Sequence, residues 1–544
     1  MGQGLDGEAV DDLINAQWDA IVVGTGMGGA TIGHALARMG WRILFCEKGA
    51  SKKRESLRGQ YAESWLGRPA VPAPRHAKTL RAAGRFYHEI EDVSDADARR
   101  FIPFIGAGAG GSSALYGMAL ERFFPEDFLP GRYHPLDRVP ARSSQWPFSY
   151  ESFEPYYVRA EKLYRVQFGP GGGEDAGSLP NMSTQSRALY EHFSSQGLTP
   201  YRLPQGCRFV DGCVGCQGFL CAKDCKHEPD NICLEPALNQ EGAALLENFE
   251  VQSIEMEEGR ATGVVGRLGD RRITIRGGVV ILAGGALATP ALLLNSRSVV
   301  WPNGVGNHFD QVGRYLMRHL IDLYAVFPRV GPAEGNAKEL AFNDFYCVDQ
   351  QKLGTVQSFG SMPPGFVLAD QMLHDLQLGT KKTMPVILIR VMRPLMEKIF
   401  GRLFARAHVL ASIMEDTPHS ENRVMIHDDD PEVIRIKYHV STYDEERLAL
   451  FRSKIKSVLR PLRYLHIQQA HNNERIAHVC GTCRAGTDPA KSVVDEWSRV
   501  HGTCNLYVVD ASWFPSSGGT NPALTIAANA LRVADHLGEK GKVT

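Results

Sequence analysis

The feature that most constrains the fold lies near the N-terminus, where a short apolar run ends at a glycine-rich turn. Residues 19–23 are a β-branched apolar run, and Gly24, Gly26 and Gly29 follow in the spacing GxGxxG. Good helix formers occupy residues 30–39. The order strand, turn, helix is typical of a Rossmann-type dinucleotide-binding unit, in which the helix N-terminus faces a pyrophosphate. The alternative is a glycine-rich turn in an ordinary α/β unit.

A second apolar strand supports the dinucleotide interpretation. Residues 42–46 predict a strand that ends at Glu47, about where an acid that binds ribose belongs. These two strands and the helix between them do not distinguish FAD from NAD.

Composition excludes several classes of protein. The 544-residue chain carries 60 basic and 61 acidic side chains, so it lacks the positive charge of a nucleic-acid binder. No stretch approaches the ~18–20 consecutive apolar residues of a membrane span. The acidic N-terminal segment does not resemble a secretory signal, so we expect a cytoplasmic protein; export with a signal-bearing partner stays open.

Further motifs follow in a fixed order along the chain. They are a second glycine-rich loop, a buried strand that enters a glycine turn, a histidine followed by a glycine–threonine pair, a third apolar strand, and a Gly-Thr-Asn-Pro segment that opens a long helix. Their positions are 106–118, 279–296, 478–483, 506–510 and 519–522.

Together these motifs resemble the glucose–methanol–choline (GMC) family of flavin oxidoreductases over nearly the whole chain. Segments 110–113 and 285–296 look like the two family signatures. Tyr116 stands where the family usually has Asn or His, and Arg297 where it usually has Gly. The closest similarity is to bacterial sugar dehydrogenase flavoprotein subunits, and aminoglycoside-type sugar alcohol oxidases belong to the same neighbourhood.

The resemblance implies a Rossmann-like α/β FAD-binding domain and an α+β substrate domain built on an antiparallel sheet. The FAD-binding domain would be discontinuous, because its motifs lie at both ends and in the middle of the chain. Its expected segments are 1–150, 203–308 and 474–544, and the substrate domain takes 151–202 and 309–473. Strands of the substrate domain are expected at 409–414, 423–427 and 433–440.

The resemblance also implies the catalytic residues. Oxidation of an alcohol requires removal of the hydroxyl proton and transfer of a hydride to the flavin N5. His478 matches the family's catalytic histidine and would be the base, and Asn521 would orient the substrate oxygen. A neutral imidazole suits this task near pH 7. Asn521 could instead only cap the helix that follows it, and we interpret His319 as structural.

The expected cofactor is FAD. The family motifs assign residues to each part of it. The ADP half would be bound by Gly24, Gly26, Gly29 and Glu47, and the pyrophosphate and flavin by Gly110, Gly111, Ser112 and Ser113. Val251 would meet the adenine, and Asp510 and Pro522 would lie near the polar edge of the flavin.

Six of the eleven cysteines fall between positions 207 and 233. Cys216, Cys221 and Cys225 resemble the iron–sulfur ligands of the glucose dehydrogenase subunit, and such a cluster would pass electrons from the flavin to an accepting partner. A structural zinc site, or disulfides and free thiols, would also account for these residues.

The expected function is therefore FAD-dependent oxidation of a CH–OH group on a small sugar or sugar-like polyol. One alternative keeps the flavin but takes an apolar alcohol, such as a sterol or a long-chain alcohol. Another is a non-catalytic electron-transfer flavoprotein subunit.

Overall fold

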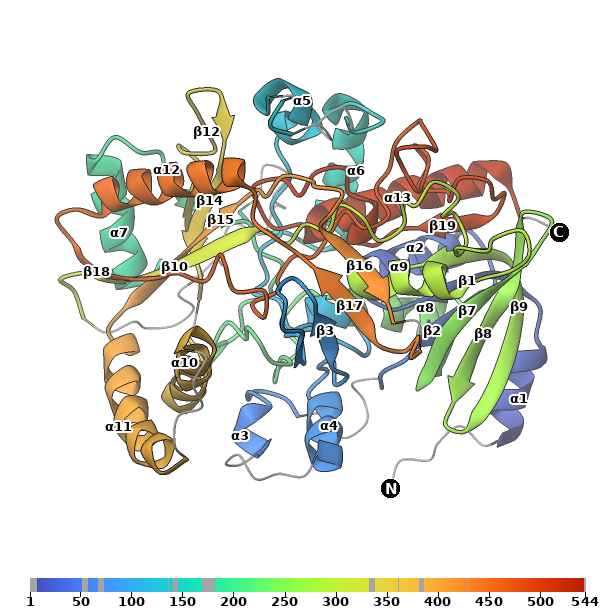
Figure 1. The fold of residues 1–544 in the computed structure, drawn as a ribbon, viewed down its shortest axis with the longest axis horizontal. Coiled ribbons are helices and arrows are strands. Elements are labelled where there is room, and N and C mark those ends of the chain that lie inside the picture. Colours follow the sequence, from blue (N-terminus) through green and yellow to red (C-terminus); the bar gives the residue numbers. More distant parts are fainter. Residues whose placement is uncertain are drawn as a thin grey trace.

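A computed structural model arranges the chain around two large β-sheets (Figure 1). The structure describes residues 7–50, 57–66, 73–135, 137–139, 145–168, 182–331, 338–360, 362–380, 386–427 and 429–542. Within these ranges, no helix is both long and apolar enough to cross a membrane.

The first sheet has seven strands and a parallel centre. Its order is β6-β2-β1-β9-β8-β7, and β19 pairs in parallel with the second half of β9. β1 and β2 are almost wholly buried, which explains their apolar sequences. The strands are β1 (Trp18–Val23), β2 (Ile43–Glu47), β6 (Ala244–Glu247), β7 (Phe249–Glu257), β8 (Arg260–Leu268), β9 (Arg271–Leu282) and β19 (Leu506–Val508).

Helices pack against this sheet and complete the larger hydrophobic core. α2 and α13 lie side by side although they come from opposite ends of the chain (Figure 1). α2 follows the glycine turn directly, so its N-terminus points at the sheet edge where β1 ends. The helices are α1 (Gly7–Asn15), α2 (Met27–Arg38), α8 (Glu235–Gln240), α9 (Gly285–Asn295) and α13 (Ala523–Lys540).

One further helix, α6 (Tyr150–Leu163), packs on α13, although it lies in the range predicted for the substrate domain. Its Phe153 and Tyr157 are buried in the core of the first sheet, and the Tyr157 hydroxyl bonds Thr525 Oγ1 at 2.8 Å. An apolar helix face joins whichever core covers it, and sequence order does not show which one.

The second sheet has six antiparallel strands in the order β18-β10-β15-β14-β11-β5. α7 (Thr184–Ser195) and α12 (Thr442–Leu459) contribute to its core, and α10 (Gly365–Thr380) pairs with α11 (Val386–Phe404) below it in Figure 1. The strands are β5 (Tyr201–Arg202), β10 (Leu320–Phe327), β11 (Leu340–Phe342), β14 (Gly354–Ser358), β15 (His408–Met414) and β18 (Arg463–Ile467).

A four-stranded sheet joins distant segments in the order β16-β17-β3-β4. β17 pairs in parallel with β3, so residues from the two predicted domains share this sheet. Its strands are β3 (Ile90–Asp92), β4 (Arg99–Phe101), β16 (Arg423–Ile426) and β17 (Ile434–Lys437).

The structure also contains a strand pair, β12 (Cys347–Val348) and β13 (Gln351–Lys352), and the helices α3 (Glu63–Leu66), α4 (Ala73–Ala82) and α5 (Pro130–Tyr133).

Candidate active site

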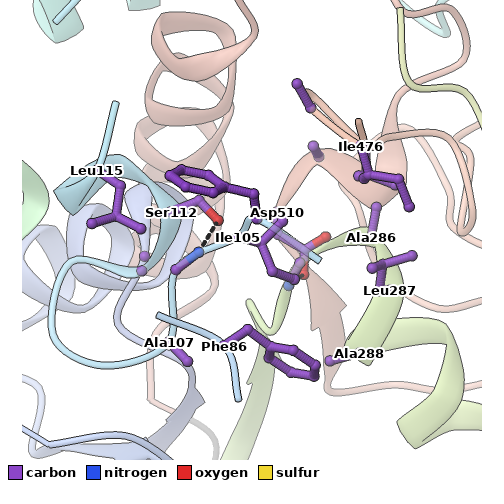
Figure 2. Close-up of a pocket in the computed structure, with 18 of the residues that line it drawn as sticks. Phe86, Ile105, Ala107, Ser112, Leu115, Ala286, Leu287, Ala288, Ile476 and Asp510 are labelled. Carbon is purple, nitrogen blue, oxygen red and sulfur yellow. Dashed lines mark hydrogen bonds between the residues drawn. The ribbon is translucent and has the colours of Figure 1, made fainter. Parts of the chain in front are cut away.

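A cavity of about 1050 Å³ lies where the three sheets meet. Its lining comes from the glycine turn after β1, the loop 104–119, the start of α9, the inner face of the second sheet and the segment 475–479. Figure 2 shows Phe86, Ile105 and Ser112 on one side of this space and Ala286, Leu287 and Ile476 on the other. The segments that the sequence motifs selected therefore meet around one cavity.

The glycine turn after β1 has little room for side chains except toward the cavity. Gly24 has a φ of +98°, and a Cβ there would lie 2.5 Å from the carbonyl oxygen of Ala283. A Cβ at Gly29 would lie 2.1 Å from the carbonyl oxygen of Gly24, whereas one at Gly26 would meet only Gly111 Cα at 3.9 Å. Gly29 is thus required for packing, while Gly26 keeps its open side free for a ligand.

Glu47 lies at the end of β2 and lines the cavity, as predicted for a ribose-binding acid. Its Oε2 accepts from the amide and the hydroxyl of Thr25 at 3.1 and 2.7 Å, and its Oε1 accepts from the amides of Gly49 and Gly108 at 2.9 and 3.1 Å. The carboxylate therefore also ties the first glycine turn to the second glycine-rich loop.

The second glycine-rich loop forms a short turn against the first. Gly111 has a φ of +54° and packs on Gly26, and Ser112 Oγ accepts from the amide of Gly106 at 3.1 Å (Figure 2). Gly111, Ser112 and Ser113 line the cavity, whereas Gly110 precedes them with a φ of +85° and shapes the turn.

The remaining predicted cofactor residues also reach the cavity. Val251 lies on β7, and Pro522 caps the start of α13. Asp510 Oδ2 accepts from Gly285 N at 2.9 Å and from Thr289 Oγ1 at 2.5 Å. Burial raises the pKa of Asp510.

His478 and Asn521, the predicted catalytic pair, face each other in the cavity. His478 Nε2 lies 3.5 Å from Asn521 Nδ2, and Gln357 Nε2 donates to Asn521 Oδ1 at 2.7 Å. The bond from Gln357 holds the Asn521 amide with its nitrogen toward the imidazole. A hydroxyl that approached both nitrogens from the cavity would meet an acceptor, Nε2, and a donor, Nδ2.

His319 sets the protonation pattern of His478. His319 Nε2 lies 3.0 and 2.9 Å from the carbonyl oxygens of Ser517 and Gly518, so it carries the proton, and its Nδ1 is an acceptor. The 3.0 Å contact between the two Nδ1 atoms then requires that His478 Nδ1–H donates to His319. Nε2 of His478 is then an acceptor, and Asn521 Nδ2–H is placed to donate to it at 3.5 Å. Sequence reasoning had assigned His319 only a structural role.

Two further properties of His478 are unusual. Burial, reinforced by His319 and Lys338, lowers the pKa of His478 well below its ordinary value, which keeps it neutral. His478 and His319 both have positive φ values, +53° and +61°, a strained conformation that is found preferentially at functional sites.

Lys338 is a cavity residue that sequence reasoning did not single out. A Cβ on Gly117 would lie 2.7 Å from its Nζ, so the side chain rests against the loop 115–117. Burial lowers the pKa of Lys338 to about 8, although Glu121 opposes this shift. Nothing in the local sequence marks Lys338, because only the tertiary fold brings it to the cavity.

Five cysteines lie together directly behind the loop 115–118. Cys225 Sγ lies 3.5 Å from Cys221 Sγ and 3.6 Å from Cys213 Sγ. Sulfur atoms of Cys207, Cys213 and Cys225 all lie within 4.8 Å of one another. None of the eleven cysteines forms a disulfide.

This arrangement differs from the predicted triad of Cys216, Cys221 and Cys225. All three belong to the cysteine group, but the set with metal-binding spacing is Cys207, Cys213 and Cys225, so only Cys225 is common to both. An antiparallel bridge between Cys207 and Lys226 brings the earlier cysteine beside Cys225, which spacing within the local motif could not reveal.

The fold and the cavity define a class of protein, in which a dinucleotide-binding domain and a domain built on an antiparallel sheet share one cavity lined by a buried histidine. Models of the GMC oxidoreductase family match residues 18–321 and 418–530. The chain belongs to this FAD-dependent family and is an alcohol-oxidising enzyme.

Individual relatives cover nearly the whole chain. It is 29% identical to 6'''-hydroxyparomomycin C oxidase of Streptomyces lividus, over 96% of this chain and 92% of that protein. It is 23% identical to the fructose dehydrogenase large subunit of Gluconobacter japonicus, over 95% of this chain and 97% of that protein. The crystal structure of pyridoxine 4-oxidase from Mesorbium loti has the same fold, with a TM-score of 0.64, 20% identity and coverage of 96% of this chain and 99% of that one.

Proposed function

We propose that this protein uses FAD to oxidise a CH–OH group of a sugar or sugar-like polyol, with His478 as the general base and Asn521 as the group that orients the substrate oxygen. The observation that carries the proposal is that the unprotonated nitrogen of His478, Nε2, and the Asn521 amide nitrogen meet in the cavity 3.5 Å apart. Relatives named as oxidases of 6'''-hydroxyparomomycin C and paromamine, and as a fructose dehydrogenase, support an alcohol on a sugar or a related compound.

The residues around the cavity fit FAD. The open side of Gly26 and the N-terminus of α2 suit a pyrophosphate. We assign Gly24, Gly26, Gly29 and Glu47 to the ADP half and Val251 to the adenine. As the sequence motifs indicate, we assign the pyrophosphate and flavin to Gly110, Gly111, Ser112, Ser113, Asp510 and Pro522. FAD, when bound, supplies the acceptor for the hydride.

The proton is the part of the reaction that this chain's own residues control. His478 Nε2 takes it from the substrate hydroxyl as the carbon–hydrogen bond breaks and the carbonyl forms. Asn521 Nδ2–H donates to the substrate oxygen, while Gln357 prevents the amide from turning over. His319 keeps Nδ1 protonated, so the imidazole accepts the new proton only at Nε2.

We also propose that Cys216, Cys221 and Cys225 hold an iron–sulfur cluster, with Cys207 and Cys213 supplying further thiolates. Hydrogen bonds among these thiols lower the pKa of Cys213 and Cys221, which favours the thiolate form that binds metals, and raise the pKa of Cys207, Cys216 and Cys225. The site packs on Tyr116 and Met118, one loop away from the cavity, which suits electron transfer to an accepting partner. Iron and zinc analysis of the purified protein separates this site from a structural zinc site.

The test of the main proposal is anaerobic reduction of the bound flavin by sugars, polyols and apolar alcohols. His478→Asn should retain FAD but reduce it about 100- to 10,000-fold more slowly. Equal rates in wild type and His478→Asn would contradict the role of His478 as the base, and failure of every alcohol to reduce the flavin of either protein would favour the alternative of a non-catalytic electron-transfer flavoprotein.

A further inference from the structure

The substrate side of the cavity has an apolar wall built on the second sheet. Ile321 and Leu323 of β10 stand directly opposite Ile413 and Ala411 of β15, and all four side chains line the cavity. Phe359, at the end of β14, adds an aromatic ring. Since alternate residues of a strand share a face, one continuous apolar surface faces the substrate.

This wall begins beside the catalytic pair. Gln357, which holds Asn521, is the cross-strand partner of Ala411, and Ala411 is the partner of Leu323. Neighbouring strands lie ~5 Å apart, so the wall extends from the catalytic pair across about 10 Å. Any part of the substrate that extends from the reacting carbon along this sheet therefore contacts apolar side chains.

α10 provides the opposite surface and is apolar as well. Val367 and Leu368 line the cavity, and Gln371 follows them one turn later. Among the described residues that the second sheet and α10 contribute to the lining, none is a carboxylate. The charged side chains near them are cationic: Lys338 and, from the neighbouring segments, Arg318 and Arg475.

The carboxylates of the cavity lie elsewhere. Glu47 and Asp510 lie at or just after the ends of strands of the first sheet, and backbone amides and hydroxyls already bond both of them. Glu250 on β7, and Glu89 and Glu432 beside β3 and β17, also line the cavity, but none of them belongs to the second sheet or to α10. An ammonium group placed between the sheet wall and α10 would therefore lose its hydration and find no partner, which is costly.

We infer that the substrate is an uncharged amphipathic alcohol, whose hydroxyl end meets His478 and Asn521 and whose apolar body lies between the second sheet and α10. The inference rests on the proposed function and narrows it. It separates this chain from oxidases of aminoglycosides, whose substrates carry several ammonium groups. A sugar that bears an alkyl or aryl group fits both the polar and the apolar parts of the cavity.

The test is the second-order rate of anaerobic flavin reduction in two homologous series, alkyl glucosides and straight-chain primary alcohols from one to eight carbons. Each added methylene that is buried should raise the rate about fourfold until the wall is covered. Hexyl glucoside should react at least about tenfold faster than its ω-aminohexyl counterpart, because the amine brings a charge against the apolar wall. Rates independent of chain length, or equal rates for the charged and uncharged pair, would overturn the inference.

A matched pair of variants locates the effect. Leu368→Asp puts a carboxylate into the cavity wall and should flatten the chain-length dependence and favour the ω-aminohexyl glucoside. Met372→Asp places the same group one turn further along α10, on a side chain that is 45% exposed, and should leave both series unchanged. The same response in both variants would contradict the assignment of α10 to the substrate cavity.

Binding separates this inference from the proposed function. Calorimetry with the His478→Asn holoenzyme measures the affinity of each alkyl glucoside without turnover. If no alcohol reduces the flavin, the proposed function is wrong, but affinity that rises with chain length would still support an amphipathic ligand. If glucose and methyl glucoside reduce the flavin as fast as the octyl compound, the function stands and the inference fails.

Discussion

Single residues set the chemistry of the cavity, beginning with the low pKa of His478. Burial, His319 and Lys338 all act against the imidazolium, so the base form persists below the ordinary value of 6.5. Activity that requires a neutral base is present above the pKa of the base and is lost as the pH falls through it. We therefore predict that the rate of flavin reduction stays level from neutral pH down through 6.5 and falls only at lower pH. A half-maximal rate at or above 6.5 would contradict this account.

His319 supplies a second prediction at this scale. His319→Ala removes the acceptor that holds the Nδ1 proton of His478, so the imidazole can turn or change tautomer. We expect kcat to fall at least about tenfold while FAD content is unchanged. His319→Asn, whose amide oxygen can still accept this proton, should retain more activity. His192→Ala, on α7 and outside the cavity, is the control; equal losses in the His319 and His192 variants would refute a positioning role.

Residue identities within motifs could be predicted from the sequence, whereas partners across the fold could not. The motifs selected His478 and Asn521, and the fold brings them together, although their roles stay proposals. His319 and Gln357 lie 159 and 164 positions from the groups they bond, and no local pattern marks such pairs. For the same reason the cysteine motif did not point to Cys207.

At the level of elements, the glycine turn and the start of α2 contain two glycines, Gly26 and Gly29, whose roles can be distinguished by experiment. Gly29→Ala forces a Cβ against the Gly24 carbonyl, so we expect a lower melting temperature even without FAD. Gly26→Ala meets no protein atom closer than 3.9 Å and should fold normally, but its methyl group would face the pyrophosphate and weaken FAD binding. Thermal melts of both apoproteins, with FAD titrations, check this. Unimpaired FAD affinity in folded Gly26→Ala would show that the turn does not hold the cofactor.

The packing of the second sheet depends on a buried ion pair. Lys352 Nζ, fully buried beside β14, lies 2.7 Å from Asp127 Oδ1 and 2.9 Å from Glu415 Oε1. Lys352→Met removes the ion-pair partner of Asp127 and one ion-pair partner of Glu415, which Arg447 Nη2 also approaches at 3.8 Å, and should lower the free energy of unfolding by about 3–5 kcal/mol. Lys491→Met removes one member of an exposed ion pair with Asp488 and should have little effect. Chemical denaturation compares them, and similar stabilities would contradict a structural role for Lys352.

Elements with a strong local pattern were predicted, and those stabilised by distant pairing were not. Strands β15, β16 and β17 lie close to the predicted positions, but only β15 belongs to the second sheet, because β16 and β17 pair with β3 and β4 in the four-stranded sheet. The parallel pairing of β17 with β3 joins residues 435 and 91, and two-residue contacts of this kind leave no signature in a short strand. Most of α6 falls in the range predicted for the substrate domain, whereas the helix packs on α13 in the core of the first sheet, because its apolar face fits either core.

Over the whole molecule, the two large sheets divide the work of the enzyme. The first sheet presents the glycine turns, the second sheet presents the apolar wall, and the segment 475–479 places His478 in the cavity that both sheets line. The sequence predicted a Rossmann-like domain and a second domain built on an antiparallel sheet, since the motifs follow the order found in the family. It did not predict that the wall is apolar, because this depends on which face of each strand lies against the cavity.

The most direct test of the central claim is an anaerobic titration of the purified, FAD-containing protein with an alkyl glucoside. Absorbance follows the bound flavin, and the recovered sugar is analysed for a carbonyl group. The account predicts that each equivalent of alcohol reduces one flavin and yields one carbonyl product, and that His478→Asn retains flavin but reacts far more slowly. Folded protein without flavin, flavin that no alcohol reduces, or a His478→Asn variant that reacts at the wild-type rate would contradict it.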